Sequence, residues 1–456
     1  MLICTNSIQG WNSTLPTLLL LEQCKTLNDV NQIHSRLITT GFVKNTALTS
    51  KIVLAFTSSP HPPLLEFARY LFFTHHAFRV CRKEDDSLFL WNAVIKSYSH
   101  GHDPEQALVM LCLMLENGVW VDEFSLSLVL KACSRLGMVR EGMQVHGLLR
   151  KMGIVLNLFL QNCLIALYVK SGCLGFARQV FDRAEKRDSV SYNSMIDGYV
   201  KHGFIDLARE LFDSMPMEEK NLISWNSMIS GYAQLDGGLK VSRQMFDEMP
   251  NRDLISWNSM IDGCVKCGRM EEAQALFDTM PQRDVVSWAS MIDGYAKQGE
   301  VELARTLFDE MPVRDVVVCN AMMAGYVQNG YFMEALKIFH EMQSEKNLSP
   351  DEATLLIVLS AAAQSGLVKN GVAIHHYIVR NKFYLGRKLG VALIDMYSKC
   401  GHIQNAMSVF YDIKGKIVDH WNAMIGGLAI HGKGELAFGL LMEVERTSLE
   451  PDDITF

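Results

Sequence analysis

The sequence predicts an all-α protein built as a solenoid of tandem helix–turn–helix repeats. Aligned positions Asn193, Asn226, Asn258, Ala289 and Asn320 are separated by 33, 32, 31 and 31 residues. A period of this length is typical of stacked helical hairpins. Each period also contains two apolar stripes with helical spacing, separated by a glycine and closed by a turn. Two short helices with one apolar face each cannot form a core alone, so neighbouring repeats must pack together.

The repeat from Val285 to Asp315 shows how each helix is specified. The first apolar stripe recurs at i, i+3, i+4 and i+7 and consists of Trp288, Met291, Ile292 and Tyr295. We expect this helix to end near Gly299. The second stripe consists of Leu303, Ala304, Leu307, Phe308 and Met311. Pro312 then ends the second helix, because proline has no N–H and a fixed φ.

A glycine recurs inside the first helix of successive repeats, at Gly198, Gly231, Gly263, Gly294 and Gly325. Glycine costs a helix interior about 1 kcal/mol relative to alanine, so a recurring one needs a reason. We predict that each glycine allows a close approach between helices.

Composition narrows the function without deciding it. The 456 residues carry a net charge of −7, which is unusual for a nucleic-acid-binding protein, although a solenoid can carry a basic stripe within an acidic total. The longest apolar run is far shorter than the ~20 residues that span a bilayer, so no membrane partner is expected. The 11 cysteines have no regular disulfide or zinc spacing, which favours a reducing compartment. We expect no metal and no cofactor.

The chain divides into three parts. Residues 1–87 form an irregular N-terminal region with about two degenerate helical repeats. Residues 88–452 form eleven tandem repeats, which begin at Leu88, Glu123, Leu158, Ser189, Leu222, Leu254, Val285, Val316, Glu352, Arg387 and Val418. Residues 453–456 begin a further, truncated repeat, which indicates a fragment of a longer protein.

Three motifs offer rival functions, and each has a simpler explanation. Cys264 and Cys267 form a CxxC, but Cys264 replaces a core tyrosine of the repeat and no second CxxC exists. The segment GLAIHGKG at 427–434 lacks the Ser or Thr of a phosphate-binding loop and fits a turn between helices. The pairs at 75–76 and 375–376 are histidines without ligand partners at metal spacing.

The SWNSMIDGY opening, the LFDEMP closing and repeat lengths of 31 to 36 residues resemble the pentatricopeptide repeat family of plant organelles. More narrowly, they resemble the subclass that alternates standard, long and short units. The resemblance implies a right-handed superhelix that binds single-stranded RNA with one base per repeat. It also implies a mitochondrial location, with the chloroplast as the alternative.

Relatives in this subclass often end in a cytidine deaminase domain with the signature HxE and PCxxC. Neither motif occurs here, so the chain is expected not to be an enzyme. The resemblance therefore implies an adaptor for C-to-U RNA editing or another RNA modification, with a deaminase or other RNA-processing factor acting in trans.

In this family the base is read by the fifth residue of the first helix and the last residue of the repeat. The resemblance thus assigns RNA binding to Asn92, Asp122, Asn162, Asp188, Asn193, Asn221, Asn226, Asp253, Asn258, Asp284, Asp315, Asn320, Asp351, Asn422 and Asp452. A branched aliphatic residue at the second position sandwiches the base, which assigns that role to Val190, Ile223, Ile255, Val286 and Val317. Positions two and five share one helix face.

The family code turns these pairs into an RNA sequence. Asn with a terminal Asp favours uridine, and Asn193 with Asn221 favours cytidine. Four repeats depart from the pattern, through Ala289 with Asp315, Val391 with Ile417, Ser127 with Asn157, and Leu356 with Gly386. Running parallel to the chain, the repeats predict the pyrimidine-rich strand 5′-U-n-U-C-U-U-n-U-n-n-U-3′.

Structural roles are the alternative for both columns. Asn is a good N-cap, although Ser191, Ser224, Ser256 and Ser287 already stand two residues earlier as natural caps. The terminal Asp can act simply as a favourable charge before a helix N-terminus. A protein-binding helical-repeat scaffold is the alternative function, although the 34-residue pattern of the tetratricopeptide family is absent.

Overall fold

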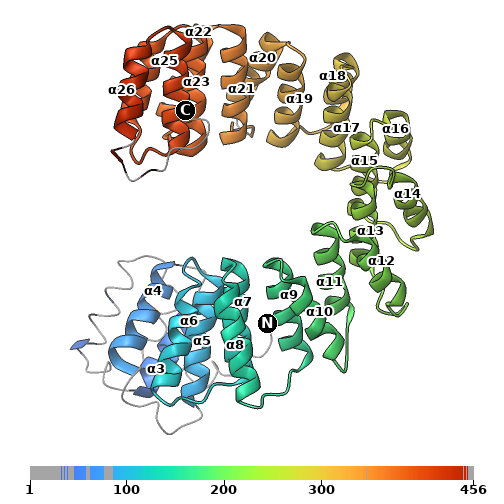
Figure 1. The fold of residues 1–456 in the computed structure, drawn as a ribbon, viewed down its shortest axis with the longest axis vertical. Coiled ribbons are helices and arrows are strands. Elements are labelled where there is room, and N and C mark those ends of the chain that lie inside the picture. Colours follow the sequence, from blue (N-terminus) through green and yellow to red (C-terminus); the bar gives the residue numbers. More distant parts are fainter. Residues whose placement is uncertain are drawn as a thin grey trace. The chain divides into compact units, whose positions relative to one another are not determined.

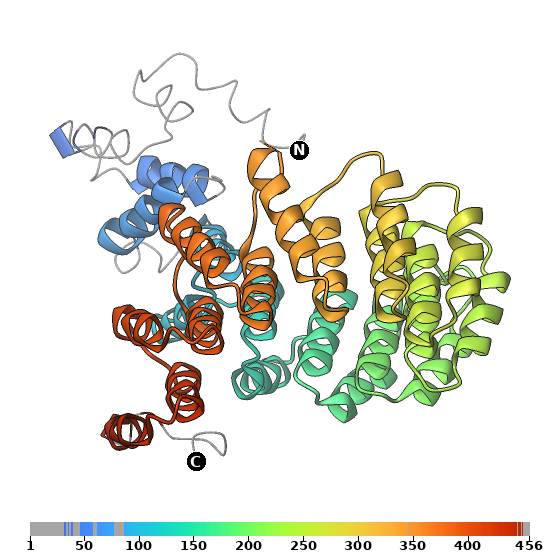
Figure 2. The ribbon, with the colours of Figure 1, turned by 90° about the horizontal axis from the view of Figure 1, so that it is seen from above.

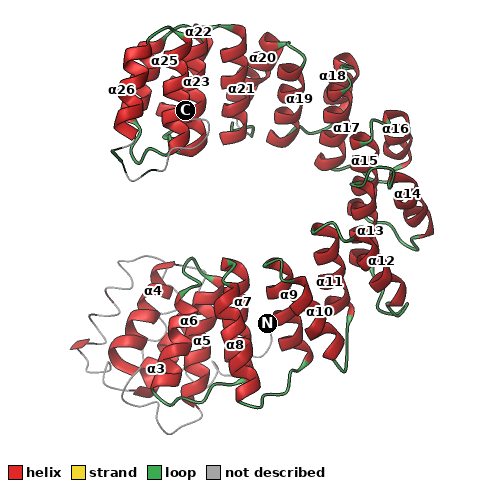
Figure 3. Cartoon of the chain, viewed as in Figure 1, coloured by secondary structure: helices red, strands yellow, loops and turns green. Residues whose placement is uncertain are grey.

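A computed structural model describes residues 46–57, 62–76, 86–345 and 347–444, together with residues 32, 35, 38, 39, 446, 447 and 449. Every regular element in these segments is helical, so the predicted all-α fold is confirmed (Figure 3). Asp452 and residues 453–456 lie outside the described residues. The chain forms two compact units, Met1–Ser227 and Met228–Phe456, which are described separately.

Helices come in consecutive hairpins, which follow one another in chain order within each unit (Figures 1 and 2). The first helices of the hairpins are α5 (Asp86–His100), α7 (Glu123–Leu136), α9 (Leu158–Lys170), α11 (Ser189–Lys201), α13 (Leu222–Ala233), α15 (Leu254–Lys266), α17 (Val285–Lys297), α19 (Val316–Gln328), α21 (Glu352–Ser365), α23 (Arg387–Lys399) and α25 (Val418–Ile430). Successive first helices contact one another from α5 to α11 and from α15 to α25, and the two helices of each hairpin within these ranges also contact each other.

The second helices are shorter on average and amphipathic. They are α6 (Gln106–Glu116), α8 (Val139–Lys151), α10 (Leu174–Arg183), α12 (Ile205–Ser214), α14 (Leu239–Glu248), α16 (Met270–Thr279), α18 (Val301–Glu310), α20 (Phe332–Ser344), α22 (Val368–Arg380), α24 (Ile403–Asp412) and α26 (Gly434–Val444). Before them lie α3 (Thr46–Thr57), α4 (Pro62–Leu71) and the π-helix η4 (Phe72–His76).

An aromatic pair recurs in the core between repeats. A phenylalanine of one second helix packs edge-on against the tryptophan at the fourth position of the next first helix, with ring centroids 4.9 Å apart for Phe277 and Trp288. The same distance is found for Phe212 with Trp225 and for Phe246 with Trp257. Such T-shaped pairs add to the hydrophobic gain of burial. They fix the orientation of each hairpin on its neighbour.

The recurring glycines mark close helix contacts, as predicted. A Cβ added to Gly325 of α19 would lie 2.5 Å from the Cβ of Ala296 on α17. At Gly294 it would lie 2.7 Å from the sulfur of Met270, and at Gly198 it would lie 2.6 Å from a methyl of Val169. Real Cβ atoms do not approach so closely, so glycine lets the first helices pack at this distance.

The turn glycines serve a different purpose. Gly299 has a φ of +82°, a left-handed conformation that glycine adopts without strain. α17 ends two residues earlier at Lys297, close to the predicted end. α18 ends at Glu310, before Pro312, which is also as expected.

Candidate nucleic-acid interface

The terminal aspartates are the N-caps of the following first helices. Asp188, Asp253 and Asp284 each accept a hydrogen bond at 2.9 Å from the backbone N–H three residues on. The serines at 191, 256 and 287 complete a capping box from the third helical position. The expectation that these serines are the caps is therefore wrong, because the extended backbone of an N-cap belongs to the Asp.

In several repeats the residue before the terminal aspartate is an arginine. This arginine anchors the turn that carries the aspartate. The guanidinium of Arg283 lies 4.5 Å from the ring centroid of Phe277, and its Nε donates to the Phe277 carbonyl at 2.9 Å. Arg187 on Phe181 and Arg252 on Phe246 repeat this arrangement. Since the same phenylalanines belong to the core, the turn is tied to the most rigid part of the repeat.

The fifth-position asparagines donate a hydrogen bond to the terminal residue of the same repeat. The Nδ2 of Asn258 lies 3.1 Å from Asp284 Oδ1. The corresponding distances are 3.2 Å for Asn92 with Asp122, 3.2 Å for Asn162 with Asp188, 3.1 Å for Asn193 with Asn221, and 3.2 Å for Asn320 with Asp351. The residue pairs that were predicted to read one base are thus joined in five repeats.

These asparagines do not cap helices. They occupy the fifth position of the repeat, inside the first helix, and their amides are buried or half-buried. In some repeats the amide carbonyl also has a partner: Ser191 Oγ lies 2.7 Å from Asn162 Oδ1, and Thr354 Oγ lies 2.7 Å from Asn320 Oδ1. In others, at Asn193 and Asn258, the buried Oδ1 has no partner among the described residues. A buried acceptor without a partner is rare in a folded protein.

Hydrogen bonding keeps two terminal aspartates, Asp188 and Asp351, charged. Burial alone would raise the pKa of Asp188, but the Ser191 N–H and hydroxyl and the Asn162 amide outweigh burial and lower it. The pKa of Asp351 is lowered in the same way by Thr354 and Asn320. At neutral pH Asp188 and Asp351 therefore present carboxylates, which are strong acceptors.

Two further predicted asparagines lie at the fifth position of their repeats. Asn226 is 9% exposed on α13, and Asn422 lies half-buried on α25. Asp315 caps α19 through a 3.0 Å bond from the Val318 N–H, but the fifth residue of its repeat is Ala289, which has no amide to donate. Only Asp452 cannot be placed.

The second-position aliphatic residues are exposed, although residues of this kind are usually buried. Val190, Ile223, Ile255, Val286 and Val317 are between 53% and 62% exposed. They stand one helical turn before the asparagine column, on the same helix face. An exposed apolar side chain beside a polar pair suits contact with a flat ring.

Three second-position residues were missed by the prediction, because it looked for branched aliphatics. Phe89 on α5, Phe124 on α7 and Phe159 on α9 occupy this position and are 67%, 45% and 58% exposed. The signal was present in the alignment of repeats, since each stands three residues before the fifth position. Aromatic rings on a surface stack well on bases.

Lysines lie at the end of the same helix face. In α11, α15, α17 and α23 the thirteenth residue is a lysine that pairs with the aspartate at the ninth position, at distances of 2.5 to 2.8 Å. Such exposed pairs are worth little, about 0.3–0.5 kcal/mol. The lysines can therefore exchange this partner for an anion without large cost.

The rival motifs have structural roles. Cys264 is fully buried in α15, and burial raises its pKa to about 11, which leaves an unreactive thiol. Residues 431–433 form the turn between α25 and α26. No group of three or more His, Cys, Asp or Glu residues that could hold a metal ion occurs in the described part of the chain. Among the described helices, none is long and apolar enough to cross a membrane.

Comparisons with known proteins agree with this architecture. The PPR repeat model matches residues 89–119, 124–154, 162–189, 190–219, 223–254, 255–285, 286–316, 391–416 and 419–447, and a model of the PPR repeat family matches 314–364. The solved structure of the maize pentatricopeptide repeat protein PPR10 has a TM-score of 0.51 at 20% identity, covering 99% of this chain and 76% of that one. At this identity the likeness concerns the fold alone.

Two relatives from Arabidopsis thaliana extend the comparison. A chloroplastic pentatricopeptide repeat-containing protein is 66% identical over 440 residues, which are 96% of this chain and 72% of the relative. A mitochondrial one is 33% identical over 461 residues, which are 98% of this chain and 66% of the relative. The expectation of a mitochondrial location is therefore wrong, since the much more similar relative is chloroplastic. By sequence and by fold, the chain belongs to the pentatricopeptide repeat family.

Proposed function

We propose that this protein is a sequence-specific single-stranded RNA-binding adaptor in chloroplast RNA processing. One observation carries the proposal: the fifth-position asparagine and the terminal residue of the repeat, which are far apart in sequence, meet in a hydrogen bond in five repeats. Beside each pair stands an exposed apolar or aromatic residue. A row of such units can hold one base each.

The polarity of the pairs matches the edges of pyrimidines. Uracil carries an N–H donor at N3, and the terminal carboxylates of Asp188 and Asp284 are acceptors. Cytosine has an acceptor at N3, and Asn221 has an amide N–H to donate to it. The asparagine of each repeat has a second N–H for the carbonyl group of the base. This complementarity supports a pyrimidine-rich target, with cytidine opposite the repeat of Asn193.

The proposal also names the step of RNA processing in which the adaptor acts. The alternation of standard, long and short repeats fits an adaptor for C-to-U editing or another RNA modification, and a deaminase or other RNA-processing factor would supply the catalysis in trans. The chloroplastic relative supports the location. A scaffold for proteins is the alternative, and RNA selection separates the two.

The test is selection of bound RNA from a random single-stranded pool by the purified chain. We expect enrichment of 5′-U-n-U-C-U-U-n-U-n-n-U-3′. The Asn258→Ala protein should lose preference at the sixth position alone, because a lost base-edge contact costs about 1–3 kcal/mol. A matched Asp262→Ala variant, on the same helix but outside the base-reading pair, should keep the preference.

Other results of the selection would contradict the proposal. Enrichment of purine-rich RNA, or an Asn258→Ala protein that selects the same bases with lower thermal stability, would show that the Asn column only joins repeats. Failure to enrich any RNA would favour the protein scaffold.

A further inference from the structure

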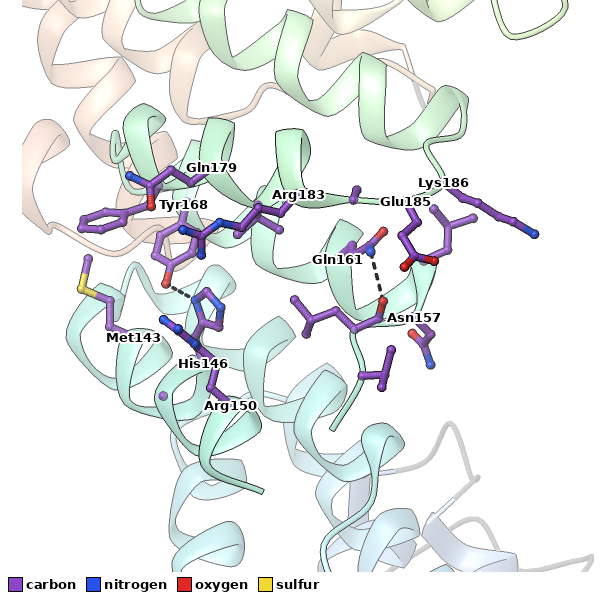
Figure 4. A pocket seen from close by; sticks show the side chains of 17 residues that line it. Met143, His146, Arg150, Asn157, Gln161, Tyr168, Gln179, Arg183, Glu185 and Lys186 are labelled. Atoms are coloured by element: carbon purple, nitrogen blue, oxygen red, sulfur yellow. Dashed lines mark hydrogen bonds between the residues drawn. The ribbon is translucent and has the colours of Figure 1, made fainter. Parts of the chain in front are cut away.

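A cavity of about 740 Å³ opens in the first unit between α8, α9 and α10, where the long repeat meets the next one (Figure 4). Gln161 and Tyr168 of α9 line it. These residues are at positions four and eleven of their helix, whereas the predicted base contacts use positions two and five. The cavity therefore opens on another helix face than the exposed Phe159.

Two arginines converge in this cavity. Arg150 extends from α8 and Arg183 from the end of α10, and both side chains approach His146 (Figure 4). Neither arginine has an acidic partner within 4 Å among the described residues. His146 Nδ1 lies 2.8 Å from Tyr168 Oη, and burial together with the two guanidinium groups lowers the pKa of the ring. Lys186 and Glu185 also line the cavity, so three cations face one carboxylate and the net positive charge favours an anion.

At the other end of the cavity, Gln161 offers an unused acceptor. The residue is 8% exposed, and its Nε2 donates to the Leu156 carbonyl at 3.0 Å. Its buried Oε1 has no partner among the described residues. Buried polar atoms are nearly always paired, so this carbonyl is suited to an incoming N–H group. Apolar contacts between the two ends come from Leu158 and Val180.

The second unit provides an internal comparison. There, His375 Nδ1 lies 3.0 Å from Tyr397 Oη in the equivalent long repeat, so the histidine–tyrosine pair belongs to the scaffold. The residues equivalent to Arg150, Arg183 and Gln161 are Val379, Asp412 and Gly390. The cations and the amide are thus particular to the first unit, and structural need does not explain them.

We propose that this cavity binds a nucleotide. The phosphate lies between Arg150 and Arg183, since planar guanidinium groups suit phosphate oxygens. The base edge donates an N–H to Gln161 Oε1, and the ribose and base pack on Leu158 and Val180. The nucleotide is either free or part of a bound RNA strand, because Asn157, the last residue of the long repeat, also borders the cavity.

Calorimetric titration of the full chain with the four ribonucleoside 5′-monophosphates tests this site. We expect saturable binding of one nucleotide per chain, and at least tenfold weaker binding of the unphosphorylated nucleosides and of inorganic phosphate. The double variant Arg150→Val with Arg183→Asp, which carries the residues of the second unit, should weaken binding at least tenfold. Arg178→Val is the matched control, because Arg178 lies on the same helix, pairs with Asp182 and does not line the cavity.

Charge reversal at the exposed cavity residue Lys186, as Lys186→Glu, gives a second, independent variant. It should weaken nucleotide binding with an unchanged melting curve. Adding the pyrimidine-rich RNA distinguishes the two sources: simultaneous binding supports a free nucleotide, and competition supports a nucleotide of the strand. Absence of saturable binding, equal loss in Arg178→Val, or displacement of the nucleotide by an oligoglutamate peptide of equal affinity would overturn the proposal.

Discussion

Two pairs of first helices, one pair in each unit, present different side chains on the same face. In α5 and α7 the second position is phenylalanine and the ninth is lysine, as Phe89 with Lys96 and Phe124 with Lys131. In α15 and α17 the second position is aliphatic, as Ile255 and Val286, and the ninth is an aspartate paired with a lysine. We name these the aromatic-basic face and the aliphatic ion-paired face.

The hydrogen bond from the asparagine to the terminal aspartate is similar in the two faces. Its length is 3.2 Å for Asn92 with Asp122 and 3.1 Å for Asn258 with Asp284. Lys131 Nζ lies 3.0 Å from His100 Nε2, and neither Lys96 nor Lys131 has a carboxylate within 4 Å in the described residues. The aromatic-basic face therefore adds flat rings and uncompensated charge to a similar reading pair. We infer that it contributes mainly affinity, and that the aliphatic ion-paired face contributes mainly selectivity.

The largest effect should come from removing the two rings. Phe89→Ala with Phe124→Ala should lower the affinity for every RNA by a factor of about 30 or more, because stacking of a base on an aromatic ring is worth about 1–3 kcal/mol. Ile255→Ala with Val286→Ala is the matched pair and should cost less. Fluorescence anisotropy with labelled RNA measures both. Equal losses in the two double variants would erase the distinction between the faces.

Salt dependence should separate the faces next. Each lysine that neutralises a phosphate of single-stranded RNA contributes about −0.7 to the slope of log K against log salt. Lys96→Gln with Lys131→Gln should therefore make the slope shallower by up to about 1.4. Lys266→Gln with Lys297→Gln should change it less, since the neighbouring aspartates already offset those charges. RNA binding measured between 50 and 300 mM salt tests this difference. A larger change of slope in the Lys266 and Lys297 double variant than in the Lys96 and Lys131 double variant would contradict the inference.

The smallest effect concerns pH, and here the units should behave alike. Asp188 in the first unit and Asp351 in the second have lowered pKa values. Such a group stabilises the fold above its ordinary pKa of about 3.9, and this contribution is lost as pH falls below about 4. Thermal melts between pH 3 and 6 should show the loss, and Asp188→Asn or Asp351→Asn should each flatten it. If only one of the two variants flattens the loss of stability, only that cap is coupled to the fold.

Much of the fold followed from the repeat itself, because periodic apolar stripes and turn glycines are local signals. The close contact at Gly325 could be predicted because glycine destabilises a helix interior, so a recurring glycine there indicates a close approach between helices. The capping role was assigned to the wrong residue at Ser191, since Asp and Ser three residues apart are both good caps and only the backbone conformation separates them.

Contacts between distant residues of one repeat could not be predicted from local signals. The bond from Asn258 to Asp284 joins residues 26 apart, and composition says nothing of it. The exposed rings of Phe89 and Phe124 were missed because the family pattern suggested aliphatic residues. The cavity at His146 depends on three helices together, so no segment of sequence carries its signal.

The contact between Gly325 and Ala296 has a consequence for RNA length. With a backbone hydrogen in place of a side chain, α19 and α17 approach more closely than any pair of alanines could. If each first helix presents one reading pair, the distance between those helices is the step that the strand must match for each nucleotide. We expect a methyl group at Gly325 to push α17 and α19 apart and so to lengthen this step.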